Sequence, residues 1–421
     1  MTNISTATWS FSKKFIFLFI LLYTFFYIFP FPFDAFPQVD FIFNYYERLN
    51  NAFTLWASKH VFSITHIRKV PYTDSGDTTF DYAKVLIFFI LSILLALCIA
   101  IIDKKRNNYK NLNAWLFVYI RYCIGFYLLV YGFDKVFKSH FPFPSLEKLE
   151  QPFGQSSPQG LLWAFMGYST TYTVYLGIIE VLSGFLLFFR RTTALGAIMA
   201  LMIMINVTIV NFSYDVPVKL FALHLVVYAA ILLSPYFRSI LNFFILKKET
   251  KLAEQIQPVY PKLIGEYRKA IKGIVIGAFT LLFMNFSIVN MRTDGDSAPK
   301  PTLYGIYKST GIDLKHAQNK RANTLQIEFD EIIFDTKNTI VKISDRNFYF
   351  ETQVNTINRT ILFISNTDTS NKFEYHYLLS NDFLTLIEND STKVQFKKLN
   401  LDSLPLLKRK FHWVVEYPEN N

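Results

Sequence analysis

Residues 172–211 read YTVYLGIIEVLSGFLLFFRRTTALGAIMALMIMINVTIVN, and this stretch decides the class of the protein. Two apolar runs, Tyr172–Phe189 and Ala194–Asn211, are separated by the four residues Arg190, Arg191, Thr192 and Thr193. A helix needs about 20 mostly apolar residues to cross the hydrocarbon core of a bilayer. Each run is close to that length, so the stretch predicts two membrane-spanning helices joined by a tight hairpin.

Further apolar runs of similar length lie on either side of this hairpin. They are Phe15–Phe33, Tyr82–Ile102, Leu112–Phe133, Leu220–Ile240 and Ile271–Asn290. The first resembles a signal peptide, but no small-residue cleavage site follows it, so we expect an uncleaved anchor. The sequence therefore predicts an α-helical polytopic membrane bundle of about seven spans.

Composition agrees with a membrane protein and divides the chain. The 421 residues are 52% hydrophobic and 18% charged, whereas a soluble protein carries about 25% charged residues. Nearly all the long apolar runs lie in residues 1–290, and residues 291–421 have the composition of an ordinary soluble domain. We therefore expect two or three structural units.

The net charge of +11 is better explained by membrane topology than by nucleic-acid binding. Basic residues gather in short loops on one side of the predicted spans, as they do in cytoplasmic loops. They are Lys13, Lys14, Lys104, Lys105, Arg106, Lys110, Arg190, Arg191, Arg238, Lys247, Lys248, Lys251, Lys262, Arg268, Lys269 and Lys272. The pattern predicts a multi-pass protein of the cell inner membrane with a cytoplasmic N-terminus and a periplasmic C-terminal domain. Its expected partner is the lipid bilayer, and no nucleic acid is expected.

The chain divides into regions with different roles. They are 1–111, an N-terminal membrane region with two spans and an outer amphipathic loop; 112–246, a four-helix core; 247–295, a cytoplasmic linker and the seventh span; and 296–421, a periplasmic β domain. In the outer loop, Ile42, Tyr45, Leu49, Phe53 and Trp56 recur at helical spacing. That spacing is typical of a helix lying on the membrane surface.

Short runs rich in Ile, Val, Thr, Phe and Tyr follow one another in the C-terminal region. They are Thr324–Phe329, Thr339–Ile343, Phe348–Val354, Thr360–Ile364, Phe373–Leu378, Thr385–Ile387, Lys393–Lys397 and Phe411–Tyr417. Asn, Asp, Ser and Gly separate them. Regular spacing with alternation predicts an antiparallel meander, either a barrel or a sandwich.

Two ionisable residues lie near the middle of predicted spans, where charge is costly and usually has a partner or a function. They are Arg121 in the third span and Glu180 in the fourth. Counting at about 1.5 Å per residue puts both at similar depth in antiparallel helices, which predicts an ion pair facing the bundle interior. Such a pair either only packs helices or forms a site for an anionic head group, a quinone or a proton.

A second polar group is expected at the outer ends of the spans. Lys135 closes the third span, and Tyr214, Asp215 and Lys219 lie between the fifth and sixth, with His224 about one turn deeper. Lys219 is four residues after Asp215, within reach of a local ion pair. These residues form either a small polar pocket open to the outside or a helix cap with interfacial anchoring.

Small residues in the spans favour close helix packing. Gly125, Gly132, Gly177 and Gly184 are the candidates. The cysteines, Cys98 and Cys123, both lie in apolar runs and form no C-x-x-C pair, so no disulfide framework or zinc ribbon is expected. No metal site is predicted.

The third to sixth spans resemble the DoxX family of small four-helix membrane proteins. The resemblance rests on Arg121, Gly125, Gly132 and Lys135 in one helix, and on Gly177, Glu180 and Gly184 followed by Arg190 and Arg191 in the next. It covers about residues 112–246. The segments 75–79, 190–193, 214–219 and 411–418 resemble longer DoxX-type proteins with extra transmembrane helices and a C-terminal β domain.

The resemblance implies a link to redox systems, because the family takes its name from a subunit of a thiosulfate:quinone oxidoreductase. It makes quinone the cofactor to consider, and redox or envelope proteins the partners. Direct dithiol chemistry is not expected, because the chain lacks a cysteine pair. The leading expectation is an accessory or quinone-site subunit of a membrane redox system. The alternative is a non-enzymatic binding, transport or envelope-assembly protein that uses the outer pocket and the β domain.

Overall fold

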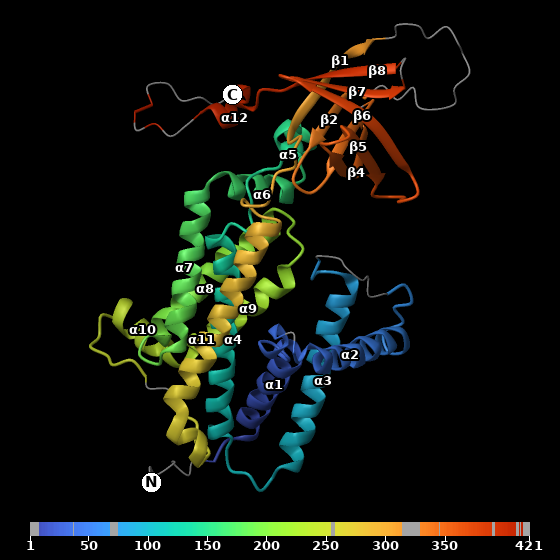
Figure 1. Cartoon of the computed structure of the whole chain (residues 1–421). Coiled ribbons are helices and arrows are strands. Elements are labelled where there is room, and N and C mark those ends of the chain that lie inside the picture. Colours follow the sequence, from blue (N-terminus) through green and yellow to red (C-terminus); the bar gives the residue numbers. More distant parts are fainter. Residues whose placement is uncertain are drawn as a thin grey trace. The chain divides into compact units, whose positions relative to one another are not determined.

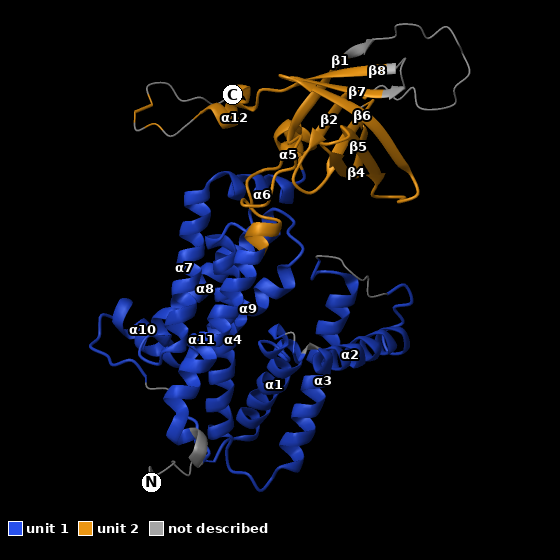
Figure 2. Ribbon diagram, viewed as in Figure 1, with its two compact units in different colours: residues 1–141, 157–289 blue, residues 142–156, 290–421 orange. Residues whose placement is uncertain are grey.

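The computed structural model describes residues 8–36, 38–67, 75–253, 257–313, 329–344, 346–389, 392–409, 412, 414 and 415. The chain forms two compact units, coloured separately in Figure 2. Unit 1 comprises residues 1–141 and 157–289, and unit 2 comprises residues 142–156 and 290–421. The short segment 142–156, which the sequence placed in the four-helix core, therefore belongs with the C-terminal domain.

Unit 1 contains the spanning helices, and the predicted bundle is confirmed. Seven helices within the described residues are long and apolar enough to cross a membrane. They are α1 (Phe11–Ile28), α3 (Thr79–Ile102), α4 (Lys110–Val136), α7 (Thr170–Phe188), α8 (Thr193–Ser213), α9 (Lys219–Leu233) and α11 (Lys262–Thr293), shown in Figure 1. By length and composition, this is a multi-pass membrane protein.

Shorter helices complete unit 1. They are η1 (Phe33–Ala35), α2 (Asp40–His60), α6 (Pro158–Tyr168), η3 (Ser234–Tyr236) and α10 (Phe237–Phe244). Helix α2 runs across the direction of α3 (Figure 1) and packs Ala57 against Ile87 and Phe88. Its predicted apolar row, Ile42, Tyr45, Leu49, Phe53 and Trp56, is exposed, as expected for a helix whose apolar face meets lipid.

Local capping explains where several helices begin. Ser157 accepts a hydrogen bond from the Gly160 N–H, and Pro158 occupies the first turn of α6. Thr78 and Asp81 form a reciprocal capping box at the start of α3. Both arrangements satisfy backbone N–H groups that the first turn of a helix leaves unpaired.

Helix α4 lies at the centre of unit 1. Its Ile120, Ile124 and Leu128 are buried in a core shared with α1, α8 and α9. On another side, Phe126 packs against Phe279 of α11, with ring centroids 4.5 Å apart. A helix that is apolar nearly all round is suited to this buried position.

Unit 2 is a closed barrel of eight antiparallel strands in sequence order. The strands are β1 (Gly305–Asp313), β2 (Glu331–Phe334), β3 (Thr339–Ile343), β4 (Arg346–Asn355), β5 (Thr360–Ser365), β6 (Lys372–Ser380), β7 (Phe383–Asn389) and β8 (Thr392–Lys398). Strand β1 pairs with both β2 and β8, which closes the barrel. The structure thus decides between barrel and sandwich.

Short helices accompany the barrel in unit 2. They are α5 (Leu146–Glu150), η2 (Phe153–Gln155), η4 (Leu401–Ser403) and α12 (Pro405–Lys408). Leu146 of α5 packs against Ile306, Ile333 and Ile340 on the first three strands. This contact buries both faces of β2.

The predicted strands from Thr339 to Lys397 match β3 to β8. Two predicted strands lie largely outside the described part of the chain. These are Thr324–Phe329, of which residues 324–328 are not described, and Phe411–Tyr417, of which four residues are not described. Strands β1 and β2 were missed. The barrel interior is filled by side chains, including Tyr307, Phe334, Phe363 and Phe396, as is usual for an eight-stranded barrel.

Candidate functional site

Helices α4 and α7 approach closely because glycines meet at their contact. A Cβ added to Gly177 would lie 2.6 Å from the carbonyl oxygen of Gly132. One added to Gly184 would lie 2.8 Å from the carbonyl oxygen of Gly125. Any larger side chain would push the helices apart. These glycines therefore set the register in which the charged residues of the two helices face each other.

This register brings Lys135 of α4 against Glu180 of α7. The Lys135 ammonium donates to both Glu180 carboxylate oxygens, at 2.9 and 2.7 Å. Their side chains are only 11% and 5% exposed. The Lys135 Nζ also lies 5.8 Å from the centre of the Tyr131 ring. Glu180 is ten residues into α7, or about 15 Å along the helix, so the pair is well inside the bundle.

The predicted Arg121–Glu180 ion pair is therefore corrected. Arg121 lies 14 residues before Lys135 on α4, a separation of about 21 Å along the helix axis. The Arg121 Nη1 donates to the Thr193 hydroxyl at 3.4 Å. The depth count failed because the glycine contacts place Glu180 beside the last turn of α4 rather than beside its middle.

Two more polar residues lie close to Lys135: Asp134 in the last turn of α4, and His140 on the segment that follows α4. Burial lowers the pKa of His140 to about 4, and the charge of Lys135 acts in the same direction. The imidazole is therefore neutral near pH 7 and has one donor and one acceptor nitrogen. Asp134 accepts hydrogen bonds from Ser139 at 2.8 Å and from Ser287 of α11 at 2.6 Å. The pair thus lies beside further polar groups.

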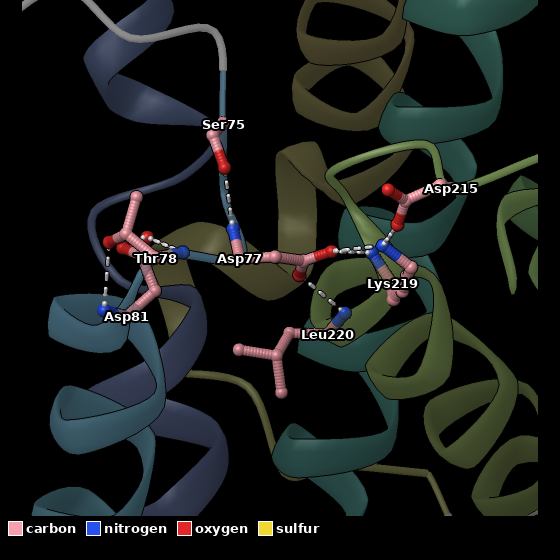
Figure 3. Close-up of polar contacts among 7 residues, drawn as sticks. All are labelled: Ser75, Asp77, Thr78, Asp81, Asp215, Lys219 and Leu220. Atoms are coloured by element: carbon pink, nitrogen blue, oxygen red, sulfur yellow. Dashed lines mark hydrogen bonds and ion pairs between the residues drawn. The ribbon is translucent and has the colours of Figure 1, made fainter. Parts of the chain in front are cut away.

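A second polar cluster joins the segment before α3 to the start of α9 (Figure 3). Asp77 accepts hydrogen bonds from the backbone N–H groups of Lys219 at 2.7 Å and Leu220 at 2.9 Å. The Lys219 ammonium lies 2.7 Å from Asp215 and 3.8 Å from Asp77. The local Asp215–Lys219 pair is therefore present, but Asp77, and not Asp215, caps α9.

His224 lies one turn into α9 and is held by aromatic residues of α1. Its Nδ1 lies 2.6 Å from the Leu220 carbonyl oxygen, and its Nε2 lies 2.6 Å from the Tyr23 hydroxyl. A carbonyl only accepts, so Nδ1 carries the proton and Tyr23 donates to Nε2. The ring of Tyr27 stacks on the imidazole at 3.7 Å.

The five residues proposed for one outer pocket are thus divided among separate environments. Lys135 pairs with Glu180, Asp215 and Lys219 pair with each other, and Tyr214 packs in an apolar cluster with Phe141 and Val216. His224 contacts the α1 tyrosines. Asp77, Tyr23, Tyr27 and His140 were missed as site residues. Asp77 could have been found from the sequence, because an Asp in a turn such as 75–79 often caps a helix. Nothing in the sequence indicated that the aromatic residues of α1 contact His224.

Comparison with known proteins gives one relationship. A stretch of 124 residues is 32% identical to the uncharacterized protein YwoB from Bacillus subtilis (strain 168), and it spans 30% of this chain and 79% of YwoB. This chain belongs to the YwoB family. No protein-family model matches this YwoB-family chain, and no solved structure matches it.

Across the part of the chain that the structure describes, no three His, Cys, Asp or Glu side chains gather as a metal site would require. Cys98 is exposed, Cys123 is buried, and both are free thiols. Organic ligands that accept hydrogen bonds from Lys135 and His140 suit the YwoB-family site better, because the ammonium and the neutral imidazole both donate.

Proposed function

We propose that this protein is an accessory subunit of a redox system in the cell inner membrane, and that it holds a quinone head group beside Lys135 and Glu180. The observation that carries the proposal is that the motif residues of the DoxX resemblance converge. Gly132 and Lys135 on α4 meet Gly177 and Glu180 on α7. Ionisable groups inside a membrane bundle usually mark a functional site.

The residues beside the pair fit the needs of a quinone head group. Lys135 and the neutral His140 supply donors for carbonyl oxygens, and Tyr131 supplies an aromatic face. When bound, a quinone takes up two electrons from a partner subunit and two protons. The Glu180 carboxylate, held by Lys135, would lie beside the bound head group.

Membrane orientation is part of the same proposal. The basic loops favour a cytoplasmic N-terminus and a periplasmic β barrel. The end of α4 and the start of α9 would then lie toward the periplasmic side. Redox or envelope proteins that meet the barrel there are the proposed partners.

Quinone content tests the proposal. Full-length protein extracted in a mild detergent should carry a quinone, measured by extraction and chromatography. Glu180→Gln and Lys135→Met should lower its amount at least tenfold. Asp215→Asn is the matched control, because that carboxylate is 83% exposed, and it should leave the content unchanged. Absence of quinone from the unaltered protein, or equal amounts in all variants, would contradict the proposal.

The barrel supports the alternative of a non-enzymatic binding or envelope-assembly protein. Because its interior is filled, the barrel would act through its exposed side chains, which include Phe348, Leu378 and Leu379 at 42%, 44% and 51%. Exposed apolar residues of this kind are frequent at protein interfaces. Charged replacements there should release a co-purifying envelope protein while quinone content stays constant.

A further inference from the structure

Arg121 is a buried cation for which the described residues supply no carboxylate partner. Its side chain is 4% exposed. Its Nε has no hydrogen-bond partner, its Nη1 donates to the Thr193 hydroxyl, and its guanidinium lies 5.5 Å from the centre of the Tyr122 ring. Among the described residues, no carboxylate forms an ion pair with it. A buried charge without a partner is costly, so an anion from outside the chain is expected near it.

Two more cations lie at the same level of unit 1. Arg190, after α7, and Lys272, on α11, are close enough to Arg121 for the three positive charges to act on one another. The described residues form no ion pair with Arg190 or Lys272 either. The Lys272 ammonium instead lies 4.5 Å from the centre of the Phe189 ring. Positive charge therefore gathers at this part of unit 1, and an anion that accepts several hydrogen bonds, such as a phosphate group, would be attracted to it.

An apolar groove between α7 and α11 begins at Lys269 and Lys272 of α11. It has a volume of about 570 Å³, within the range of about 300–1,000 Å³ that ligand sites occupy. Its walls include Phe185, Phe189, Gly277 and Leu281, and Lys269 and Lys272 line it at one end. A Cβ added to Gly277 would meet nothing within 4 Å. The glycine therefore leaves the groove open instead of permitting a helix contact within the chain.

We propose that this groove binds an anionic phospholipid, whose phosphate lies against Lys272 and Lys269 and whose acyl chain lies along Gly277 and Leu281. The polar and apolar parts of such a lipid match the order of charged and apolar residues along the groove. Anionic lipids are also abundant where basic residues meet the cytoplasmic leaflet. This inference is independent of the quinone proposal, which concerns residues about 21 Å away along α4.

A second copy of the chain fits the groove less well. Gly273 and Gly277 form a G-x-x-x-G pair, a spacing that often brings two helices together. However, a symmetric contact there would also bring together the Lys269 and Lys272 of both copies, with one nearby carboxylate per copy, Glu266. Lipid binding supplies the negative charge that this contact lacks.

Thermal melting of full-length protein in a mild detergent tests the proposal. Dioleoyl phosphatidylglycerol should raise Tm by about 5 °C at saturation, because a ligand of the folded state stabilises it. Dioleoyl phosphatidylcholine and inorganic phosphate should not. Lys272→Gln should weaken the lipid titration roughly fivefold, as expected for one cation near the membrane surface, and Gly277→Leu should abolish it. Position 277 faces open space and Lys272 is partly exposed, so both variants should still fold.

Matched controls are available on exposed positions. Lys248→Gln and Ala278→Leu should titrate like the unaltered protein, since both residues are exposed and neither lines the groove. An equal shift with phosphatidylcholine or with inorganic phosphate would overturn the proposal, as would an unchanged titration in Gly277→Leu. A mass decrease from dimer to monomer in Gly277→Leu would instead assign the groove to a second copy and also overturn it.

Discussion

A charged side chain inside a membrane is understood only once its partner is known. The sequence identified Arg121 and Glu180 as charges that are energetically costly to bury in a membrane. Their partners depend on the register between helices, which cannot be read from the sequence of one helix. Asp77 shows the same limit, because it lies 142 residues from the Lys219 backbone group that it accepts from. The chemical types were predictable, whereas the pairs required the three-dimensional arrangement.

The Lys135–Glu180 pair should behave as one energetic unit. Lys135→Ala and Glu180→Ala each leave a buried charge uncompensated, which costs about 3–5 kcal/mol in soluble proteins and less in membranes, where charges recruit water. Each should therefore lower Tm in detergent by several degrees. Lys135→Met with Glu180→Leu should recover much of the loss. Single losses that simply add would show that the two side chains do not interact.

His140 should make the stability of unit 1 depend on pH. Burial lowers its folded pKa to about 4, below its ordinary value of about 6.5. The unfolded chain therefore binds the proton first, and stability falls as pH drops from about 6.5 to 4, by roughly 2–3 kcal/mol. His140→Gln should remove that part of the slope in melting experiments. If the two proteins lose stability in parallel over this range, the imidazole is not held neutral.

At the level of elements, periodic apolar patterns predicted the spans and most strands correctly. Long apolar helices are recognisable because the bilayer requires a fixed length. Strand β2 has only four residues, all buried, so it lacks the alternation that reveals a half-buried strand. Contacts between elements were less predictable, since the four α4 and α7 glycines indicate close packing without indicating which glycine meets which.

Replacing a contact glycine should separate α4 from α7. Gly177→Ala would place a Cβ within 2.6 Å of the Gly132 oxygen and 2.8 Å of the Val136 nitrogen, which are backbone atoms that cannot rotate away. Overpacking of this kind costs about 1–3 kcal/mol. A lower Tm and a weakened Lys135–Glu180 coupling are expected. Gly273→Ala is the control, because its Cβ meets nothing within 4 Å; it should be neutral or stabilising.

For the whole molecule, the division into units bears on topology. Unit 2 is assembled from the segment that follows α4 and the segment that follows α11. Four spanning helices, α7, α8, α9 and α11, lie between those attachment points. An even number of crossings returns the chain to the same membrane face, so the seven-span count is consistent with one domain built from both segments. The sequence predicted the domain but not its second segment, because 142–156 is too short to carry a pattern.

The segment 142–156 should therefore stabilise the barrel in trans. Its Leu146 N–H donates to Asp335 at 2.7 Å, and its Glu147 accepts from the Tyr349 hydroxyl at 2.7 Å. The Leu146 side chain covers three strands.

Residues 290–421 expressed alone should give a β-type circular dichroism spectrum and a cooperative melt. A peptide of residues 142–156 should raise that Tm, because it buries Leu146, a group worth about 1.5–3 kcal/mol when fully buried. The same peptide with Leu146→Asp should have no effect. Equal shifts with both peptides would mean that the contact does not stabilise the barrel, and a disordered spectrum would mean that residues 290–421 do not fold without the rest of the chain.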